Sequence, residues 1–282
     1  MLKRRFVRPE RYIRKLFYAR MGYPLNLACP VTYNEKLQWL KLYWHNPVLT
    51  TLVDKAAVKD YVAEKIGREY IIPTIGLWKR PQEIDWEALP RQFVLKCTHD
   101  SGGLVICRDK ESFDRGAAVR VLKKSLRHNY YYEGFEWPYK NVKPRILAEP
   151  YLEDVATKEL RDYKFFCFDG EVKALFVATD RGKAGEDVKF DFFDAEYNHL
   201  PIKQGHENAA TPPQRPAHFE QMKQLAATLS KDFPHVRVDF YEANGQVYFG
   251  EMTFFHHGGW TKFDPAQWDY TFGEWLKLPA DV

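Results

Sequence analysis

Residues 237–253 read Arg-Val-Asp-Phe-Tyr-Glu-Ala-Asn-Gly-Gln-Val-Tyr-Phe-Gly-Glu-Met-Thr, and they indicate how the C-terminal part of the chain folds. Polar and apolar residues alternate from the first of them, which predicts a strand, and residues 246–252 predict the return strand. Asn244-Gly245 is typical of a tight hairpin turn, because both residues tolerate positive φ. We therefore expect Asp239 and Glu251 to lie close together across this hairpin.

The two carboxylates of this hairpin are candidate metal ligands. Like charges on rigid neighbouring strands repel unless a cation lies between them, and magnesium carrying a nucleotide phosphate is the usual occupant. Antiparallel strands also commonly carry one carboxylate each on a solvated face, so a structural pair remains the alternative. Strict alternation further predicts that Glu251 shares a face with Val247 and Phe249.

Length and composition limit the class of protein. A chain of 282 residues can bury a large core and is expected to divide into two or three subdomains. Its net charge of +4 gives little support to bulk nucleic-acid binding, so no nucleic-acid partner is expected. The four cysteines lack metal-site spacing, and the sequence shows neither a signal peptide nor a transmembrane run, which favours a cytoplasmic protein.

Basic residues crowd the start of the chain. On a helix they predict either a solvated face or an edge that contacts phosphate or membrane, which allows a peripheral location at the inner membrane face. The residues are Lys3, Arg4, Arg5, Arg8, Arg11, Arg14 and Lys15.

Helices and short strands are both predicted, which indicates a mixed α+β fold. Helices are expected over residues 11–18, from residue 33 with Thr32 as N-cap, and over 51–66, 112–129 and 216–232. Strands are expected at 70–73, 75–78, 93–97, 104–107, 146–149, 163–168 and 171–178, with a long loop that contains strand fragments over 180–216. The expected division is a helical segment 1–50, a subdomain 51–148 and a subdomain 149–282.

A lysine and a glycine-rich loop form a second candidate site. Lys96 ends an apolar strand, and Ser101-Gly102-Gly103 follows in the loop. The lysine can neutralise phosphate charge, and glycine amides can approach phosphate oxygens closely. Neither a P-loop nor a Rossmann glycine motif is present, so those two nucleotide sites are not supported.

The order of the motifs along the chain resembles the ATP-grasp superfamily. More closely, it is similar to the teichuronopeptide-biosynthesis (TupA-like) type of ATP-grasp protein found in polysaccharide gene clusters. The motifs that carry this similarity are residues 33–40, Asp54-Lys55, 93–102, 162–170 and 250–254.

This resemblance implies an ATP-grasp fold that holds ATP and Mg²⁺ between two α+β subdomains. It implies phosphate contacts from Lys55, Lys96 and the loop residues Ser101, Gly102 and Gly103. It implies adenine contacts from Glu149 and from the Tyr151-Leu152 backbone, and ribose contacts from either Glu153 or Asp154. Asp239 and Glu251 would hold magnesium, with Thr253 at the position where the family usually has asparagine. Arg237 would lie near the reacting phosphoryl group, and Lys164 and Arg181 are candidate phosphate or carboxylate contacts.

The resemblance also implies a reaction. ATP would phosphorylate a carboxylate, and an amine would attack the acyl phosphate to form an amide. The family context suggests that an amino acid is joined to a uronic-acid carboxyl of a capsular or cell-wall glycan. The alternatives are a metal-dependent glycosyltransferase, which would be stabilised by a nucleotide sugar rather than by ATP, and a non-enzymatic membrane-docking scaffold.

Overall fold

The computed structural model describes residues 7–180 and 187–280, and it divides the chain into two compact units. Residues 46–152 form one unit, here called the inserted unit. Residues 1–45 and 153–282 form the other, here called the main unit. The three-part division expected from the sequence stays a prediction.

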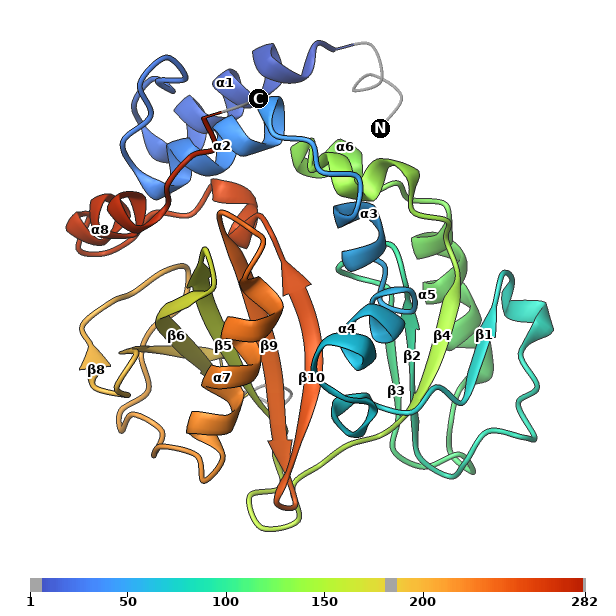
Figure 1. The fold of residues 1–282 in the computed structure, drawn as a ribbon. Helices are drawn as coiled ribbons and strands as arrows, with labels where there is room; N and C mark the ends of the chain where they lie inside the picture. Colours follow the sequence, from blue (N-terminus) through green and yellow to red (C-terminus); the bar gives the residue numbers. More distant parts are fainter. Residues whose placement is uncertain (1–6, 181–186, 281–282) are drawn as a thin grey trace. The chain divides into compact units, whose positions relative to one another are not determined.

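The inserted unit is built on a four-stranded antiparallel sheet in the order β1-β4-β2-β3 (Figure 1). Its strands are β1 (Gly76–Trp78), β2 (Phe93–Cys97), β3 (Leu104–Cys107) and β4 (Ile146–Pro150). Its helices are α3 (Leu49–Leu52), α4 (Val58–Ile66), α5 (Arg115–Leu126) and α6 (Tyr131–Gly134), with 3₁₀ turns at 68–70, 81–83 and 137–141.

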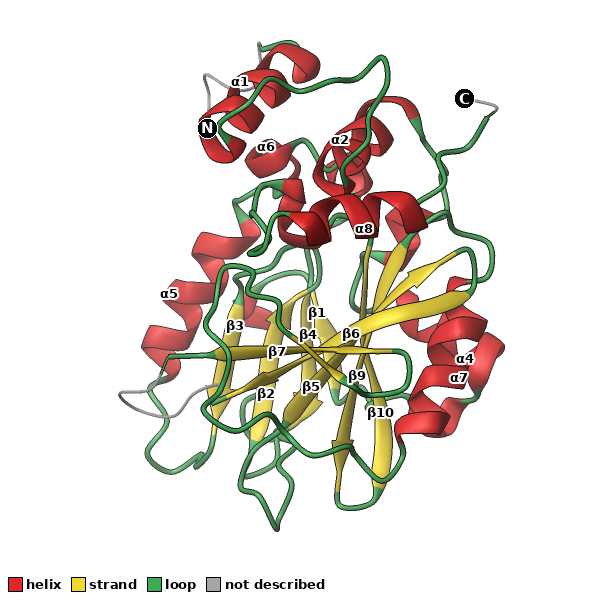
Figure 2. Cartoon of the chain, turned by 90° about the vertical axis from the view of Figure 1, so that its left-hand side faces the viewer, coloured by secondary structure: helices red, strands yellow, loops and turns green. Residues whose placement is uncertain are grey.

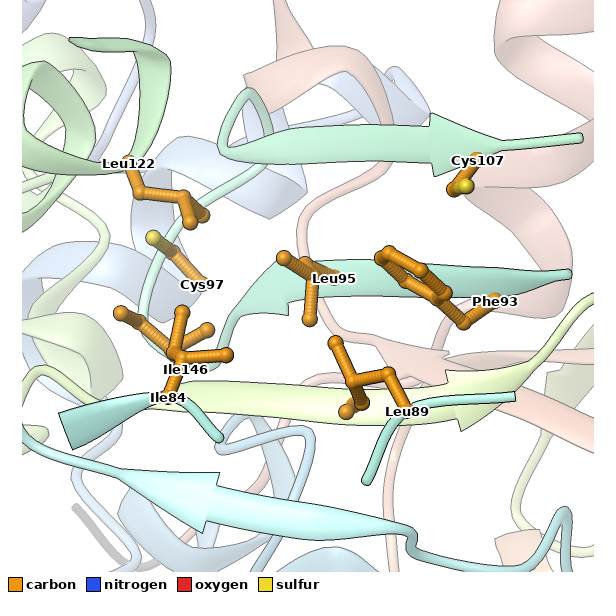
Figure 3. Close-up of a cluster of buried hydrophobic side chains, with 9 residues drawn as sticks. Ile84, Leu89, Phe93, Leu95, Cys97, Cys107, Leu122 and Ile146 are labelled. Atoms are coloured by element: carbon orange, nitrogen blue, oxygen red, sulfur yellow. The ribbon is translucent and has the colours of Figure 1, made fainter. Parts of the chain in front are cut away.

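One face of this sheet packs into a hydrophobic core (Figure 3). Phe93, Leu95 and Cys97 alternate along β2 and are almost completely buried, because successive strand side chains point to opposite faces. Helix α5 contributes Leu122 to the same cluster. The other residues of β2, including Lys96, therefore lie on the opposite face.

The main unit is built on a six-stranded antiparallel sheet in the order β10-β9-β5-β6-β7-β8. Figure 2 draws its labelled strands in yellow. Its strands are β5 (Arg161–Phe168), β6 (Glu171–Thr179), β7 (Lys189–Asp194), β8 (His199–Leu200), β9 (Val236–Ala243) and β10 (Gln246–Thr253). Its helices are α1 (Pro9–Met21), α2 (Tyr33–Tyr43), α7 (Phe219–Ser230) and α8 (Gln267–Trp275), with a 3₁₀ turn at 256–259. Helix α7 packs against β5, β6 and β9.

Helix α2 begins where the sequence predicts. The Thr32 side chain accepts a hydrogen bond from the Glu35 amide, and the Glu35 side chain accepts one from the Thr32 amide, which completes a capping box. The Tyr33 hydroxyl donates to His235 Nε2 at 2.8 Å, and His235 Nδ1 in turn donates to the Cys167 carbonyl at 2.9 Å. Helix α2 is thereby joined to the sheet of the main unit.

Two sequence predictions of local structure are wrong. The helix expected over 51–66 is interrupted, because Asp54 Oδ1 accepts hydrogen bonds from the amides of Ala56 and Ala57 and starts a new turn before α4. Residues 70–73 form no strand, since a 3₁₀ turn ends at Tyr70 and residues 71–73 have no regular secondary structure. The mixed α+β class is confirmed by the two antiparallel sheets and their helices.

Within residues 7–180 and 187–280, no helix combines the length and the apolar composition that crossing a membrane requires.

Candidate functional site

The predicted hairpin of the main unit is confirmed, with one change of register. Strands β9 and β10 pair across Asn244-Gly245, where both residues have positive φ. Glu251 lies directly opposite Asp239. A bulge at Gly250 inserts one residue into β10, so the expected alternation is wrong beyond it and Glu251 does not share the buried face of Val247 and Phe249.

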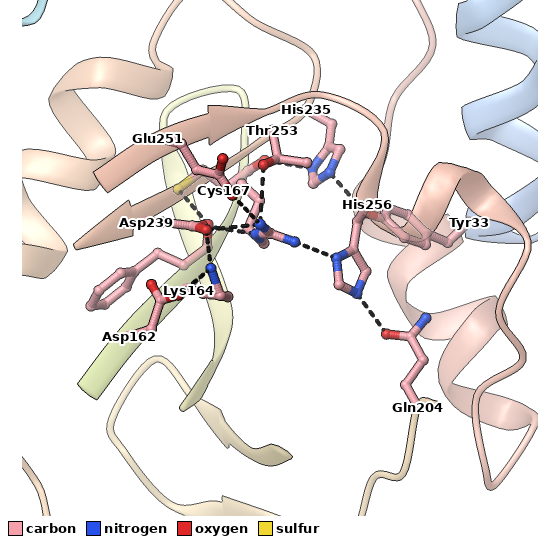
Figure 4. A network of polar contacts seen from close by, with 12 residues as sticks. Tyr33, Asp162, Lys164, Cys167, Gln204, His235, Asp239, Glu251, Thr253 and His256 are labelled. Carbon is pink, nitrogen blue, oxygen red and sulfur yellow. Dashed lines mark hydrogen bonds and ion pairs between the residues drawn. The ribbon is translucent and has the colours of Figure 1, made fainter. Parts of the chain in front are cut away.

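The bulge brings Glu251 and Thr253 to the side of the hairpin where Arg237 and Asp239 lie (Figure 4). The guanidinium donates from Nε to Asp239 Oδ1 at 2.7 Å and from Nη2 to Oδ2 at 2.8 Å. The same Nη2 reaches Glu251 Oε1 at 3.2 Å and Thr253 Oγ1 at 3.0 Å. Arg237 therefore contacts all three predicted metal ligands.

A buried lysine completes this cluster. Lys164 on β5 lies opposite Asp239 in the sheet register, and its Nζ forms ion pairs with Asp239 and, at 2.7 Å, with Asp162. Burial raises the pKa of Asp239 to about 6, although its contacts with Arg237 and Lys164 act in the opposite direction. The carboxylates of Asp162 and Asp239 are thus buried beside the positive charges of Lys164 and Arg237.

The oxygen atoms of Asp239, Glu251 and Thr253 are the kind of donors that a hard cation such as Mg²⁺ takes. In this structure they contact Arg237 instead. The described ranges 7–180 and 187–280 contain no group of three or more His, Cys, Asp or Glu side chains arranged to hold a metal ion. A divalent cation bound here would have the Thr253 hydroxyl as a ligand beside the carboxylate oxygens, and it would replace some of the contacts that Arg237 makes.

The inserted unit carries a separate cationic cluster. Glu149 on β4 is almost completely buried and forms ion pairs with Lys96 at 2.7 Å and Lys59 at 2.5 Å. Lys59 Nζ also donates to the Ile72 carbonyl at 2.7 Å and to Thr74 Oγ1 at 3.0 Å. Although burial opposes it, the two lysines lower the pKa of Glu149. The carboxylate predicted to accept the adenine amino group is engaged by lysines here, and its adenine role stays a prediction.

Lys96 and Glu149 share the face of the four-stranded sheet opposite the core. Lys96 lies opposite Leu104, and Val94 lies opposite both Glu149 and Ile106. Leu104 and Ile106 are 49% and 47% exposed. This face therefore offers apolar side chains next to a lysine, a combination that suits a planar base attached to phosphates.

The loop between β2 and β3 is tied to its surroundings. Lys55 lies in the turn before α4, where its Nζ donates to the Asp100 carbonyl and its amide donates to the Thr98 carbonyl at 3.1 Å. A Cβ on Gly103 would lie 2.6 Å from Cys97 Cβ, so close packing requires glycine there. Gly102 has open space instead, and Ser101 is exposed. The phosphate roles of Lys55 and of this loop remain predictions.

The two acidic residues proposed for ribose differ in their surroundings. Asp154 Oδ2 accepts from the Asn244 amide at 2.8 Å, and its Oδ1 accepts from the Thr157 amide at 2.9 Å. Asn244 Nδ2 also donates to the Glu153 carbonyl at 3.1 Å. The Asp154 carboxylate thus holds the turn of the β9–β10 hairpin, a structural function that the sequence did not indicate. Tyr151 and Leu152 follow β4 at the end of the inserted unit.

Residues 35–277 match the sequence profile described as TupA-like ATP-grasp. The chain belongs to this family. The resemblance inferred from the motif order is thereby confirmed. A search of curated proteins found no significant match.

Solved ATP-grasp structures resemble the TupA-like chain at low sequence identity. D-alanine–D-alanine ligase from Bacillus anthracis, complexed with ATP, shares 15% identity over 73% of this chain and 55% of its own, with a TM-score of 0.43. The Helicobacter pylori D-alanine–D-alanine ligase shares 13% over 88% and 70%, with a TM-score of 0.44. D-cycloserine synthetase shares 16% over 82% and 72%, with a TM-score of 0.45. The TupA-like chain spans little more than half the length of the B. anthracis ligase.

Three residues of the candidate site were not among the predicted site residues, and Arg181 falls outside the described residues. Asp162 could have been found, because strand alternation places it on one face with Lys164. Lys59 follows Lys55 by four residues, but only the fold brings it to Glu149. His256 and His257 follow the second strand of the hairpin, where the sequence favours surface histidines. His256 is instead buried, and its Nδ1 accepts from Arg237 at 2.6 Å.

Proposed function

We propose that this TupA-like chain is an ATP-dependent carboxylate–amine ligase. The observation that carries the proposal is the register pairing of Asp239 with Glu251 in a chain that belongs to an ATP-grasp family. Ligases of this kind transfer the terminal phosphoryl group of ATP to a carboxylate, and an amine then displaces phosphate to form an amide. The protein's task is to position the reactants and to neutralise their charge, which requires no protein nucleophile.

Two different sets of the described residues would bind ATP and magnesium. Lys96 and Lys55 would contact phosphate oxygens, and the apolar face beside Lys96 would contact the base. Asp239, Glu251 and Thr253 would hold Mg²⁺, which offsets phosphate charge when bound. For the ribose hydroxyls we favour Glu153, because the Asp154 carboxylate is engaged by backbone amides.

Arg237 would act on the phosphoryl group during transfer. A guanidinium is always charged and presents a planar fork that matches phosphoryl or carboxylate oxygens. Although burial opposes it, Asp239 and Glu251 raise the pKa of Arg237 above its usual value. The group can therefore supply positive charge throughout the accessible pH range. Lys164 would maintain the geometry of Asp239, and Arg181 remains a candidate contact for the carboxylate substrate.

For the substrates, we propose an amino acid as the amine and a uronic-acid carboxyl of a surface glycan or its precursor as the acceptor. The support is the resemblance to ATP-grasp proteins of polysaccharide gene clusters.

The test supplies ATP, magnesium, an amino-acid mixture and a uronic-acid acceptor, and measures ADP. Release of ADP only when both substrates are present, and a hydroxamate when hydroxylamine replaces the amine, would support the proposal. Consumption of a nucleotide sugar without ATP hydrolysis would establish the glycosyltransferase alternative.

Lys96→Met is expected to weaken ATP binding by about 2 kcal/mol, roughly thirtyfold in Kd, because charge-assisted hydrogen bonds contribute about 1.5–3 kcal/mol. The fold should survive, since Glu149 keeps its ion pair with Lys59. Isothermal calorimetry measures the change, with Lys65→Met on the exposed side of α4 as the matched control. Equal affinities in the two variants would remove Lys96 from nucleotide binding.

We further propose that helix α1 contacts an anionic membrane surface. The first 34 residues contain eight basic residues and one acidic residue, a net charge of +7, so a chain of net +4 carries −3 over the remainder. Ile13 and Phe17 of α1 are buried, whereas Arg8, Arg11 and Lys15 are exposed. Tyr18 continues that exposed stripe and is 61% exposed. An exposed aromatic ring beside basic residues suits a lipid interface better than a nucleic acid.

The triple variant Arg8→Gln, Arg11→Gln, Lys15→Gln is expected to weaken binding to phosphatidylglycerol-rich vesicles about a hundredfold, since each basic residue near such a surface contributes about 1 kcal/mol. Vesicle sedimentation at low and high salt measures the effect. The control removes three exposed basic residues of α5, Arg120, Lys123 and Lys124, by the same change to glutamine. Equal vesicle binding by the two variants, or salt-insensitive binding by the unaltered chain, would contradict docking through α1.

A further inference from the structure

The hydrogen bonds around Arg237 continue into a chain that runs away from the carboxylates (Figure 4). Arg237 Nη1 lies 2.6 Å from His256 Nδ1, and His256 Nε2 lies 2.8 Å from Gln204 Oε1. Gln204 Nε2 lies 3.4 Å from the Thr261 carbonyl. Arg237, His256 and Gln204 are all buried.

The chemistry of these groups fixes the direction of the chain. A guanidinium has only donors, so His256 Nδ1 must carry a lone pair and accept from it. The ring proton is then on Nε2, which donates to Gln204 Oε1. The Gln204 amide group in turn donates to a carbonyl oxygen, which only accepts. Each polar atom along the chain is matched in a single arrangement.

We propose that His256 is a positioning residue that directs Arg237 through its neutral Nε2–H tautomer, which Gln204 fixes. Nη2 and Nε of Arg237 are held by carboxylates and a hydroxyl, whereas Nη1 is held by a neutral acceptor. His256 therefore fixes the plane of the guanidinium at the edge that faces away from Asp239, and it does so without placing another negative charge beside Arg237. The kinetic consequence rests on the proposed function, but the tautomer does not.

The electrostatic surroundings agree with a neutral ring. Burial holds the pKa of His256 well below its usual range, and His257, Arg237, His235 and Lys164 act in the same direction. Protonation at Nδ1 would place two donors and two positive charges against each other. The histidine should thus remain an acceptor for Arg237 across the pH range in which the protein is folded.

Helix α2 sets the backbone on which His256 lies. His257, Gly258 and Gly259 follow with positive φ values of 47°, 60° and 66°. Gln38 Nε2 on α2 donates to the carbonyls of Gly258 and Gly259 at 3.0 and 2.9 Å. Lys41 Nζ donates to the Gly258 carbonyl as well. A Cβ at Gly259 would collide with the Gln38 amide, so this left-handed turn and its contact with α2 both require glycine.

The direct test is nuclear magnetic resonance of the unaltered chain labelled with ¹⁵N at histidine. We expect His256, assigned by the loss of its signals in His256→Asn, to show the Nε2–H tautomer with no titration between about pH 5.5 and 8. An Nδ1–H tautomer, or titration in that range, would overturn the proposal. This measurement needs no substrate, so its outcome is separate from that of the proposed function.

The kinetic test compares two changes at His256. His256→Phe keeps a ring and removes the acceptor, so kcat should fall about tenfold or more, with the Kd for ATP unchanged. His256→Asn keeps an acceptor near the position of Nδ1 and should recover most of kcat. The control is His218→Phe, a half-exposed histidine that bonds to Glu242. Equal kcat for His256→Phe and His218→Phe, or equal losses in the Phe and Asn variants, would reject the positioning role.

Discussion

Glu251→Gln is expected to lower ATP turnover by about a hundredfold or more while leaving the protein folded. The change removes one charge from the proposed magnesium ligands, and electrostatic stabilisation by a bound metal contributes several kcal/mol to transition states of this kind. The side chain of Glu251 is 43% exposed, and its buried partner Arg237 keeps the ion pair with Asp239 after the substitution. Asp239 is less suitable for this test, because its removal would also take a buried ion-pair partner from both Arg237 and Lys164.

Steady-state ADP release and magnesium-dependent ATP binding measure the effect of Glu251→Gln. The matched control is Glu171→Gln, an exposed glutamate on β6 that pairs with Lys173. The control should retain full turnover and an unchanged dependence on magnesium. Normal turnover in Glu251→Gln would exclude this residue as a metal ligand and weaken the ligase proposal.

Lys164→Met is expected to lower the free energy of unfolding by about 3–5 kcal/mol, because breaking a buried ion pair leaves its partner charge uncompensated. Only 10% of the Lys164 side chain is exposed, and it pairs with Asp162 and Asp239, whose side chains are 2% and 1% exposed. Its removal would leave two buried carboxylates with Arg237 as their nearby cation. Urea denaturation measures the loss.

The matched control for this change is Lys173→Met on the neighbouring strand. Lys173 pairs with Glu171, whose side chain is 66% exposed, and such surface pairs contribute about 0–1 kcal/mol. The ion pair between Lys164 and Asp162 can be examined further in the double variant Lys164→Met, Asp162→Asn. This variant should recover part of the lost stability. A loss below 1 kcal/mol in Lys164→Met, equal to that of the control, would show that water or Arg237 already compensates the two carboxylates.

Local patterns predicted much of the secondary structure. The alternation along residues 93–97 and the Asn244-Gly245 turn correctly indicated β2 and the hairpin, because strand periodicity and turn chemistry are encoded in neighbouring residues. The break before α4 was not predicted. Asp54 competes for backbone amides there, and its side chain is also held at 2.7 Å by Arg145, which lies far away in sequence.

The candidate site was only partly predictable, because several of its contacts join residues that lie far apart in sequence. The sequence indicated Asp239, Glu251 and Lys96 by their positions on expected strands. The bulge at Gly250, which moves Glu251 to the side of Arg237, depends on the pairing of two complete strands. The partners of His256 and Lys59 could not be inferred from local patterns. Gln204 lies 52 residues from His256, and Glu149 lies on β4, far along the chain from Lys59 on helix α4.

The sequence by itself determined the family, the α+β class and the hairpin, because these follow from the order of short motifs and from contacts between near neighbours. The tertiary structure decided the charge pairing: which cations neutralise Asp239 and Glu149, and which tautomer His256 adopts. Electrostatic interactions and hydrogen bonds depend on distance and burial in space rather than on separation along the chain. They are therefore fixed only when the strands of each sheet have paired and α2 has packed against the turn that follows β10.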